Sequence, residues 1–140
     1  MDINIFKKLF RDLDLPEPDM NASDYKISAK DYSKFMKVLY NGSYLSNKDS
    51  EFCVGLLSQS DFKLGIKNAI PPDCVVAEKF GEGGDYENNI YNLSESAFIK
   101  CNDNTYLLTV MTQGKDMKYL PQVISNIAGE VSNQIKNYFI

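Results

Sequence analysis

The stretch DCVVAEKFGEGGDYENN, residues 73 to 89, decides the fold of this chain. It begins with the apolar run Cys74 to Ala77, which predicts the buried part of a β-strand that spans residues 74 to 80. Lys79 stands near the end of that strand, and a glycine-rich run that predicts a loop follows it. The position of this lysine raises the question of which groups it works with.

Three helices are predicted before the strand. Residues 3 to 13 carry apolar side chains at helical spacing, and the string LPEP ends that helix. SAKD, beginning at Ser28, and SNKD, beginning at Ser46, each place an aspartate three residues after a serine, which predicts the start of a capped helix. The expected buried faces of the three helices are Phe6, Leu9, Phe10 and Leu13; Tyr32, Phe35, Met36 and Leu39; and Phe52, Cys53, Leu56 and Leu57.

Two more strands and a long helix are predicted after residue 89. Strands are expected at residues 95 to 101 and 105 to 112, joined by the turn residues Asn102, Asp103 and Asn104. The string YLLTVM in the second of these is apolar on both faces, which predicts a central strand covered on both sides. The final helix is expected from about Lys118 to the end, with Pro121 in its first turn. Its apolar stripe is Leu120, Ile124, Ile127, Val131 and Ile135.

The predicted fold class is therefore α+β, in one domain. A helical portion occupies residues 1 to 60, and an antiparallel sheet of three strands with a long C-terminal helix occupies residues 70 to 140, because no helical crossover separates the strands. Such a small sheet leaves open edges that need pairing or cover. We expect an incomplete domain that belongs to something larger, or self-association through an open edge.

Composition excludes several classes of function. The net charge is −4 and no lysine- or arginine-rich run exists, which argues against nucleic acid as a partner. No apolar stretch approaches the about 20 residues that span a bilayer, and the N-terminus lacks the pattern of a signal peptide. The absence of histidine excludes Ser-His-Asp and Cys-His mechanisms. Cys53, Cys74 and Cys101 are odd in number and widely spaced, which argues against a disulfide framework and against zinc, and no cofactor is expected.

The order of these features resembles the C-terminal half of the serine β-lactamase and penicillin-binding-protein family, in its class A-like branch. Two capped helices, the turn in FKLGIKNAIPP, the strand VVAEKFGEGGDY, a two-strand meander and a final helix follow one another from about Tyr25 onward. The Lys-Thr/Ser-Gly box of that family would be Lys79-Phe80-Gly81 here, and EGGDY looks like the small-residue turn beyond it. Taken alone, the same residues are most simply a strand-end lysine with a solvated head, a core aromatic and a hairpin; their order and context favour the family match.

The resemblance implies roles for the residues of the box. Lys79 would bring a positive charge to the cleft and attract a substrate carboxylate. Gly81 and Gly83 would leave room for a substrate along the strand, and the backbone N–H of Glu82 would be an oxyanion-hole donor. Phe80 replaces a hydroxyl residue that helps to hold the carboxylate, and a lost hydrogen bond to a charged group costs about 1.5–3 kcal/mol.

The resemblance also implies a nucleophile that the matched region lacks. The Ser-x-x-Lys and Ser-x-Asn boxes precede this region in family members, so we expect them upstream of Met1. SDFK, from Ser60 to Lys63, and SDYK, from Ser23 to Lys26, imitate the first box, and Ser60 is the better candidate nucleophile. EPDMN looks like the class A loop whose glutamate activates the deacylating water, which makes Glu17 a further candidate, although a proline-rich turn explains it as well.

Three functions are compatible with these patterns. The first is the C-terminal part of an extracytoplasmic serine hydrolase that acts on a β-lactam or a cell-wall-type peptide, inactive without the upstream boxes. The second is a non-catalytic binding or scaffold domain on the same fold, which Phe80 favours. The third is an unrelated small α+β sensor-like domain that dimerises through its sheet edges.

Overall fold

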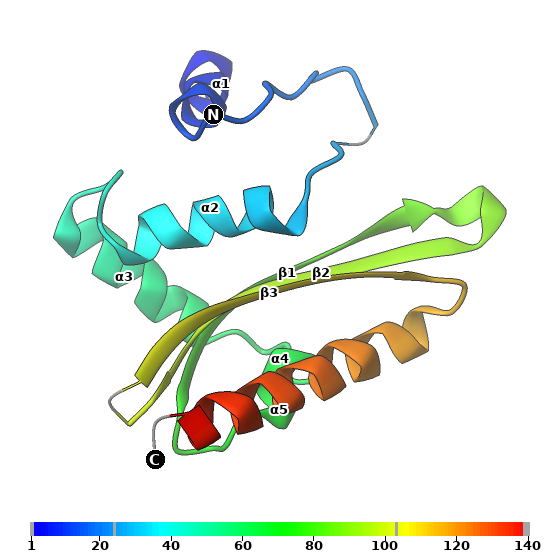
Figure 1. Cartoon of the computed structure of the whole chain (residues 1–140). Coiled ribbons are helices and arrows are strands. Elements are labelled where there is room, and N and C mark those ends of the chain that lie inside the picture. The colour runs from blue at the N-terminus through cyan, green and yellow to red at the C-terminus, as the bar shows by residue number, and fades with distance from the viewer. Residues whose placement is uncertain (1, 24, 103, 139–140) are drawn as a thin grey trace.

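The computed structural model describes residues 2–23, 25–102 and 104–138 (Figure 1). Its three strands, β1 (Val75–Asp85), β2 (Ile90–Cys101) and β3 (Asn104–Gly114), form one antiparallel sheet in the order β1-β2-β3, which confirms the predicted α+β class. A 3₁₀ turn, Tyr86–Asn88, joins β1 to β2, and another, Met117–Tyr119, precedes the last helix. The α-helices are α1 (Ile3–Asp12), α2 (Ala29–Tyr40), α3 (Asn47–Ser58), α4 (Ile66–Ala69) and α5 (Leu120–Tyr138).

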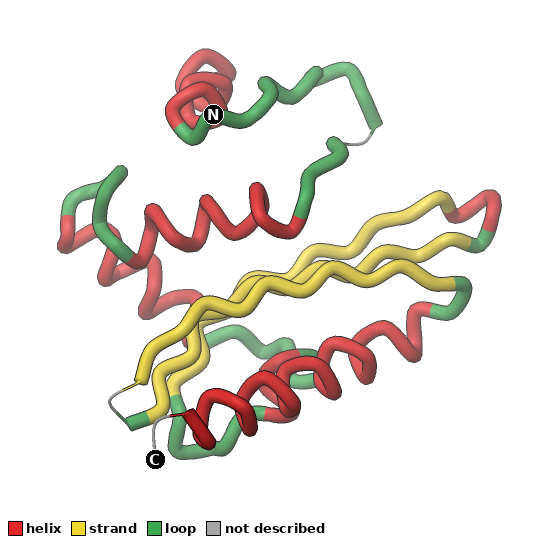
Figure 2. The backbone as a smooth tube through the Cα atoms, viewed as in Figure 1, coloured by secondary structure: helices red, strands yellow, loops and turns green. Residues whose placement is uncertain are grey.

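The elements are stacked in layers. Helices α2 and α3 cover one face of the sheet, α4 and α5 cover the other, and α1 packs outside α2 (Figure 2). The larger core lies between the sheet and the α4–α5 layer, where Leu93, Ile99 and Ile124 are fully buried. A smaller core of Met36, Ala77 and Phe98 joins the other face of the sheet to α2 and α3.

The two predicted helix caps are present. Ser28 Oγ accepts the backbone N–H of Asp31 at 3.0 Å, and Ser46 Oγ accepts that of Asp49 at 3.2 Å. Each cap satisfies an amide that would otherwise lack a partner in the first helical turn. The short helix α4 was not predicted, because four residues are too few for a periodic signal.

Two predicted apolar faces are wrong in part. Phe52 and Leu56 of α3 are mostly exposed, and the helix instead packs on the sheet through Val54 and Leu57. In α5, Ile127 is 40% exposed, because small residues take the positions closest to the sheet. The buried residues of α5 are Leu120, Ile124, Ser125, Ala128 and Ser132.

The prediction that YLLTVM is the central strand is wrong. These residues belong to β3, which lies at the edge of the sheet in the described part of the chain, while β2 is central. The string is apolar on both faces because α2 covers one face of β3 and α5 covers the other. In the predicted turn after β2, Asp103 lies outside the described residues, as do the last two residues of the predicted final helix.

The prediction against a disulfide is also wrong. Cys74 and Cys101 form a disulfide, with Cα atoms 4.6 Å apart, and Cys53 is free. The pair is brought together by the register of β1 and β2, in which Val75 lies opposite Lys100. Spacing along the chain hid this pair, since 27 residues separate two cysteines that are neighbours across the sheet.

Candidate functional site

The five predicted substrate-binding residues lie together on β1. This strand continues to Asp85, so the glycine-rich run that was predicted as a loop is part of the sheet. The register sets Lys79 opposite Ser96, and Phe80 opposite Glu95. In the described residues β1 pairs only with β2, so its other edge is open.

The fold requires a glycine at one position of this run and not at two others. Gly84 has a φ of +148°, and a Cβ there would lie 2.1 Å from the carbonyl oxygen of Ile90, so the hairpin itself requires it. A Cβ on Gly81 or Gly83 would meet nothing within 4 Å. The fold therefore does not require these two glycines, and the space beside them is free for a ligand along the strand.

The side chain of Lys79 is exposed. Within residues 2–23, 25–102 and 104–138, no carboxylate forms an ion pair with Lys79. The ammonium lies 4.7 Å from the centroid of the Phe80 ring and donates to the carbonyl oxygen of Phe80. The hydroxyl of Tyr32 in α2 donates to the carbonyl oxygen of Lys79 at 3.4 Å. The positive charge of Lys79 is thus available to an anionic ligand.

Phe80 points to the opposite face of the sheet, since successive strand residues alternate. Its ring stacks on that of Phe62, with centroids 4.3 Å apart and an interplanar angle of 19°. Phe62 lies in the segment that joins α3 to α4, so this segment covers the face of β1 that carries Phe80. An aromatic pair therefore stands at the position where the resemblance predicted a hydroxyl side chain.

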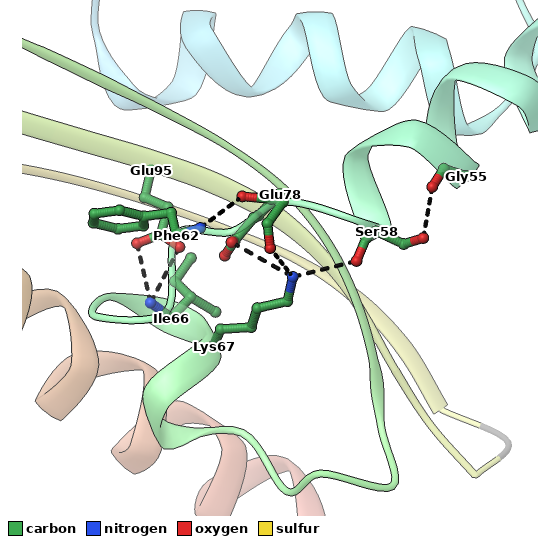
Figure 3. A network of polar contacts seen from close by, with 8 residues as sticks. Gly55, Ser58, Phe62, Ile66, Lys67, Glu78 and Glu95 are labelled. Atoms are coloured by element: carbon green, nitrogen blue, oxygen red, sulfur yellow. Dashed lines mark hydrogen bonds and ion pairs between the residues drawn. The ribbon is translucent and has the colours of Figure 1, made fainter.

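A buried acidic cluster lies below this segment and was missed by the sequence analysis (Figure 3). Glu78 and Glu95 are 1% and 0% exposed, on neighbouring strands. Both oxygens of Glu95 accept the backbone N–H of Ile66, at 3.1 and 3.0 Å, and the ammonium of Lys67 lies 3.8 Å from Glu78 Oε1. Burial, and after it the adjacent Glu78 carboxyl, raise the pKa of Glu95 to about 8.

The two remaining candidates lie outside β1. Ser60 follows α3 and precedes α4; its Oγ accepts the N–H of Phe62 at 3.3 Å, and its carbonyl oxygen accepts Lys67 Nζ at 2.8 Å. Glu17 pairs with Arg11 at 2.6 Å and with Lys7 at 3.9 Å, which binds the loop after α1 back to that helix. In the described residues, no hydrogen bond or ion pair joins either side chain to Lys79. Their catalytic roles stay predictions.

Beyond these residues, we examined the described part of the chain for a pocket, a metal site and a membrane-spanning helix. A hollow of about 390 Å³ opens between α2, α3 and the start of β1, lined by residues that include Tyr40, Ser50 and Val75, and not by Lys79. The described residues contain no cluster of three or more cysteines and acids placed to hold a metal ion. No helix that the structure describes has the length and apolar character needed to traverse a bilayer.

Comparison with protein families gives one match. The sequence profile described as the beta-lactamase enzyme family matches residues 3–139. A comparison with curated proteins finds no match. The family match covers both the helical portion and the sheet with α5.

Solved structures of low sequence identity share the fold. PBP-A matches with a TM-score of 0.76 and 12% identity, over 93% of this chain and 50% of that protein. A mutant of PBP-A in an acyl-enzyme complex with penicillin G matches with a TM-score of 0.73 and 15% identity, over 93% and 50%. A beta-lactamase from Chitinophaga pinensis matches with a TM-score of 0.71 and 18% identity, over 90% and 54%. The chain thus spans about half the length of these proteins.

Proposed function

The chain belongs to the beta-lactamase enzyme family, and from that premise we propose that it supplies the Lys79 strand of a serine acyl-transfer hydrolase. In this reaction a serine Oγ attacks the carbonyl carbon of a β-lactam or a peptide amide, the C–N bond breaks, and the nitrogen takes up a proton. Water then releases the acyl group from the serine. The serine and the lysine that activates it are expected on a Ser-x-x-Lys segment outside these 140 residues.

The observation that carries this proposal is the combination of an unpaired ammonium with an open strand edge. Lys79 has no carboxylate partner in the described residues, although the chain has a net charge of −4. Gly81 and Gly83 leave the adjacent space free. In the proposed enzyme, Lys79 attracts the anionic part of the substrate, and the backbone N–H of Glu82 stabilises the oxyanion. The penicillin G complex of the PBP-A mutant supports this substrate class by analogy.

A second function is favoured by Phe80. The stack of Phe80 on Phe62 gives an apolar surface at the position where a carboxylate would need a hydroxyl donor. A non-catalytic domain that binds a peptide or a protein partner would use this surface together with the open edge of β1. On this alternative, the Lys79 strand recognises its ligand without an acyl-enzyme.

The deciding experiment begins with the coding sequence upstream of residue 1. A reading frame with a Ser-x-x-Lys helix is then expressed whole, beside the 140-residue chain, and both are incubated with a fluorescent penicillin. The hydrolase proposal predicts covalent labelling of the whole protein, none of the short chain, and strongly reduced labelling of the whole protein carrying Lys79→Ala. A folded whole protein without labelling, or a frame that lacks the upstream serine, supports the binding domain instead.

A further inference from the structure

Glu78 and Glu95 form a buried acidic pair beneath the segment that connects α3 to α4 (Figure 3). They lie on β1 and β2, diagonally across the register in which Glu78 faces Ala97 and Phe80 faces Glu95. Both carboxyl groups are excluded from solvent, with exposures of 1% and 0%. Buried carboxyls at this depth need a partner or a proton.

The pair holds the connecting segment in place. The Glu95 carboxyl accepts the N–H of Ile66 with both oxygens, and a Cβ on Gly65 would lie only 1.8 Å from Glu95 Oε2. The backbone at residues 65–66 therefore lies directly on this carboxyl. Lys67 Nζ donates to the carbonyl oxygens of Ser58, at 3.2 Å, and Ser60, at 2.8 Å. The same ammonium is the cation nearest to Glu78 among the described ion pairs.

The charges of this cluster balance only when the pair keeps one proton. Two ionised carboxylates would face a single ammonium, that of Lys67 in α4. Both oxygens of Glu78 lack a hydrogen-bond donor within the described part of the chain, and a proton on the adjacent Glu95 carboxyl would supply one. The titratable groups that act on Glu95 are Glu78 from β1 and Lys67 from α4, while Tyr32 from α2 feels the charge of Glu95. Burial and the Glu78 carboxyl raise the pKa of Glu95 to about 8, in agreement with this geometry.

We propose that the Glu78–Glu95 pair is a pH-sensitive lock on residues 60 to 66, closed while the pair holds one proton and released when that proton is lost. Ionisation places two negative charges in a buried site where Lys67 is the one cation paired with them among the described residues, so the segment opens to admit solvent. Opening moves Phe62 away from Phe80 and uncovers the face of β1 that carries Phe80. The consequence for ligand access rests on the proposed function, but the lock itself does not.

Limited proteolysis with trypsin tests the lock. Lys63 is exposed in the middle of the segment, and Lys26 lies in the loop before α2, which serves as an internal reference for the pH dependence of trypsin. Cleavage after Lys63 relative to Lys26 is expected to rise about fivefold or more between about pH 6.5 and about pH 9.5. The midpoint is expected near the pKa of about 8. A ratio that stays constant over this range overturns the proposal.

Two variants separate the lock from general loosening. Glu95→Gln keeps an acceptor for Ile66 and a donor for Glu78 without a charge, so its ratio is expected to stay low at every pH. Glu78→Gln removes the like charge, so its step is expected at lower pH or with smaller amplitude. An unchanged step in Glu95→Gln overturns the proposal. If that variant does not fold, the NMR chemical shift of the Ile66 amide is followed in the wild-type chain instead. A chemical shift that stays constant from about pH 6.5 to about pH 9.5 overturns the proposal.

One more variant distinguishes the hydrolase proposal from the pH-sensitive lock. Lys79→Ala removes the ammonium of the box and leaves the acid pair intact, so it should retain the step in trypsin cleavage. Loss of penicillin labelling with the step retained would affect only the hydrolase proposal. Loss of the step in Lys79→Ala would assign the pH response to the box lysine and overturn the lock.

Discussion

The ring of Phe62 stacks on the ring of Phe80, with centroids 4.3 Å apart, and so fixes the α3–α4 segment on the strand that carries Lys79. The two residues are eighteen positions apart and belong to different structural layers. Their contact lies directly beside the Glu78–Glu95 pair, because Phe80 faces Glu95 across the strands. An apolar contact and a buried polar cluster thus hold the same segment.

The first prediction concerns the energy of this stack. Phe62→Ala and Phe80→Ala should each destabilise the chain, and a double-mutant cycle should give a coupling energy of about 0.5–1.5 kcal/mol, as expected for an aromatic pair. Urea denaturation followed by circular dichroism measures the four free energies of unfolding. Phe6 and Phe10, an edge-to-face pair with ring centroids 5.0 Å apart, provide a control cycle whose variants should not change trypsin cleavage at Lys63. A coupling indistinguishable from zero would mean that the stack does not hold the segment.

The second prediction compares two glycines of β1. Gly84→Ala should cost about 1–3 kcal/mol, because its φ of +148° is unsuited to a residue with a Cβ. Gly81→Ala should change stability by no more than about 0.5 kcal/mol, because its Cβ would meet nothing within 4 Å. Thermal unfolding of both variants checks the pair. In the whole protein, Gly81→Ala should weaken ligand binding despite its normal stability, and equal effects of the two substitutions on stability would contradict this assignment.

Most of the fold could be predicted from local signals. The serines at positions 28 and 46 are helix caps whose chemistry is set within four residues, and the strands carry their own propensity. The position of β3 and the Cys74–Cys101 disulfide could not be predicted, since both depend on how strands pair. An apolar strand under two helical layers has the same sequence pattern at the edge of a sheet as in its centre.

The part of the candidate site whose residues are consecutive in the sequence could be predicted, and the part that strand pairing brings together could not. Lys79, Phe80 and Gly81 follow one another on β1, so their proximity is given by the sequence. Glu78 and Glu95 lie on separate strands, and only the pairing register brings them to one face. The sequence did contain a signal for each acid. Side chains two residues apart lie on the same face of a strand, so Glu78, with the apolar Val76 and Phe80 on either side, should face the core. The Phe62–Phe80 contact gave no comparable signal.

The third prediction concerns the disulfide. Replacing Cys74 and Cys101 by serine should destabilise the chain by about 2–4 kcal/mol, because the link closes a loop of 27 residues in the unfolded chain. The melting temperature of the oxidised protein should fall in reductant, and the double variant should no longer respond to reductant. Cys53→Ser is the matched control and should keep the response, since Cys53 is free. An oxidised wild-type protein with three reactive thiols would show that the link does not form.

The fourth prediction is a stability maximum near pH 5. The pKa of Glu95 is raised from 4.5 to about 8, so the folded chain binds one proton more than the unfolded chain between these values. The contribution of Glu95 to the free energy of unfolding is therefore fully present below about pH 4.5. It falls as the pH rises to about 8, by at most about 1.4 kcal/mol per pH unit. At the acid end the sign reverses. Hydrogen bonds lower the pKa of Asp12, Asp31 and Asp85, with Lys8, Lys34 and Asn88 as their first partners, so stability is lost as pH falls below about 3.8.

The variant Glu95→Gln isolates the alkaline limb of this profile. A glutamine does not titrate, so its free energy of unfolding should be nearly constant between about pH 5 and about pH 8, while the loss below about pH 4 remains. Urea titrations at one-unit pH steps give both profiles. If wild type and variant decline in parallel above pH 5, another group causes the decline, and Glu95 is ionised in the folded chain. That result would also show that the folded chain tolerates the second buried charge that is proposed to release residues 60 to 66.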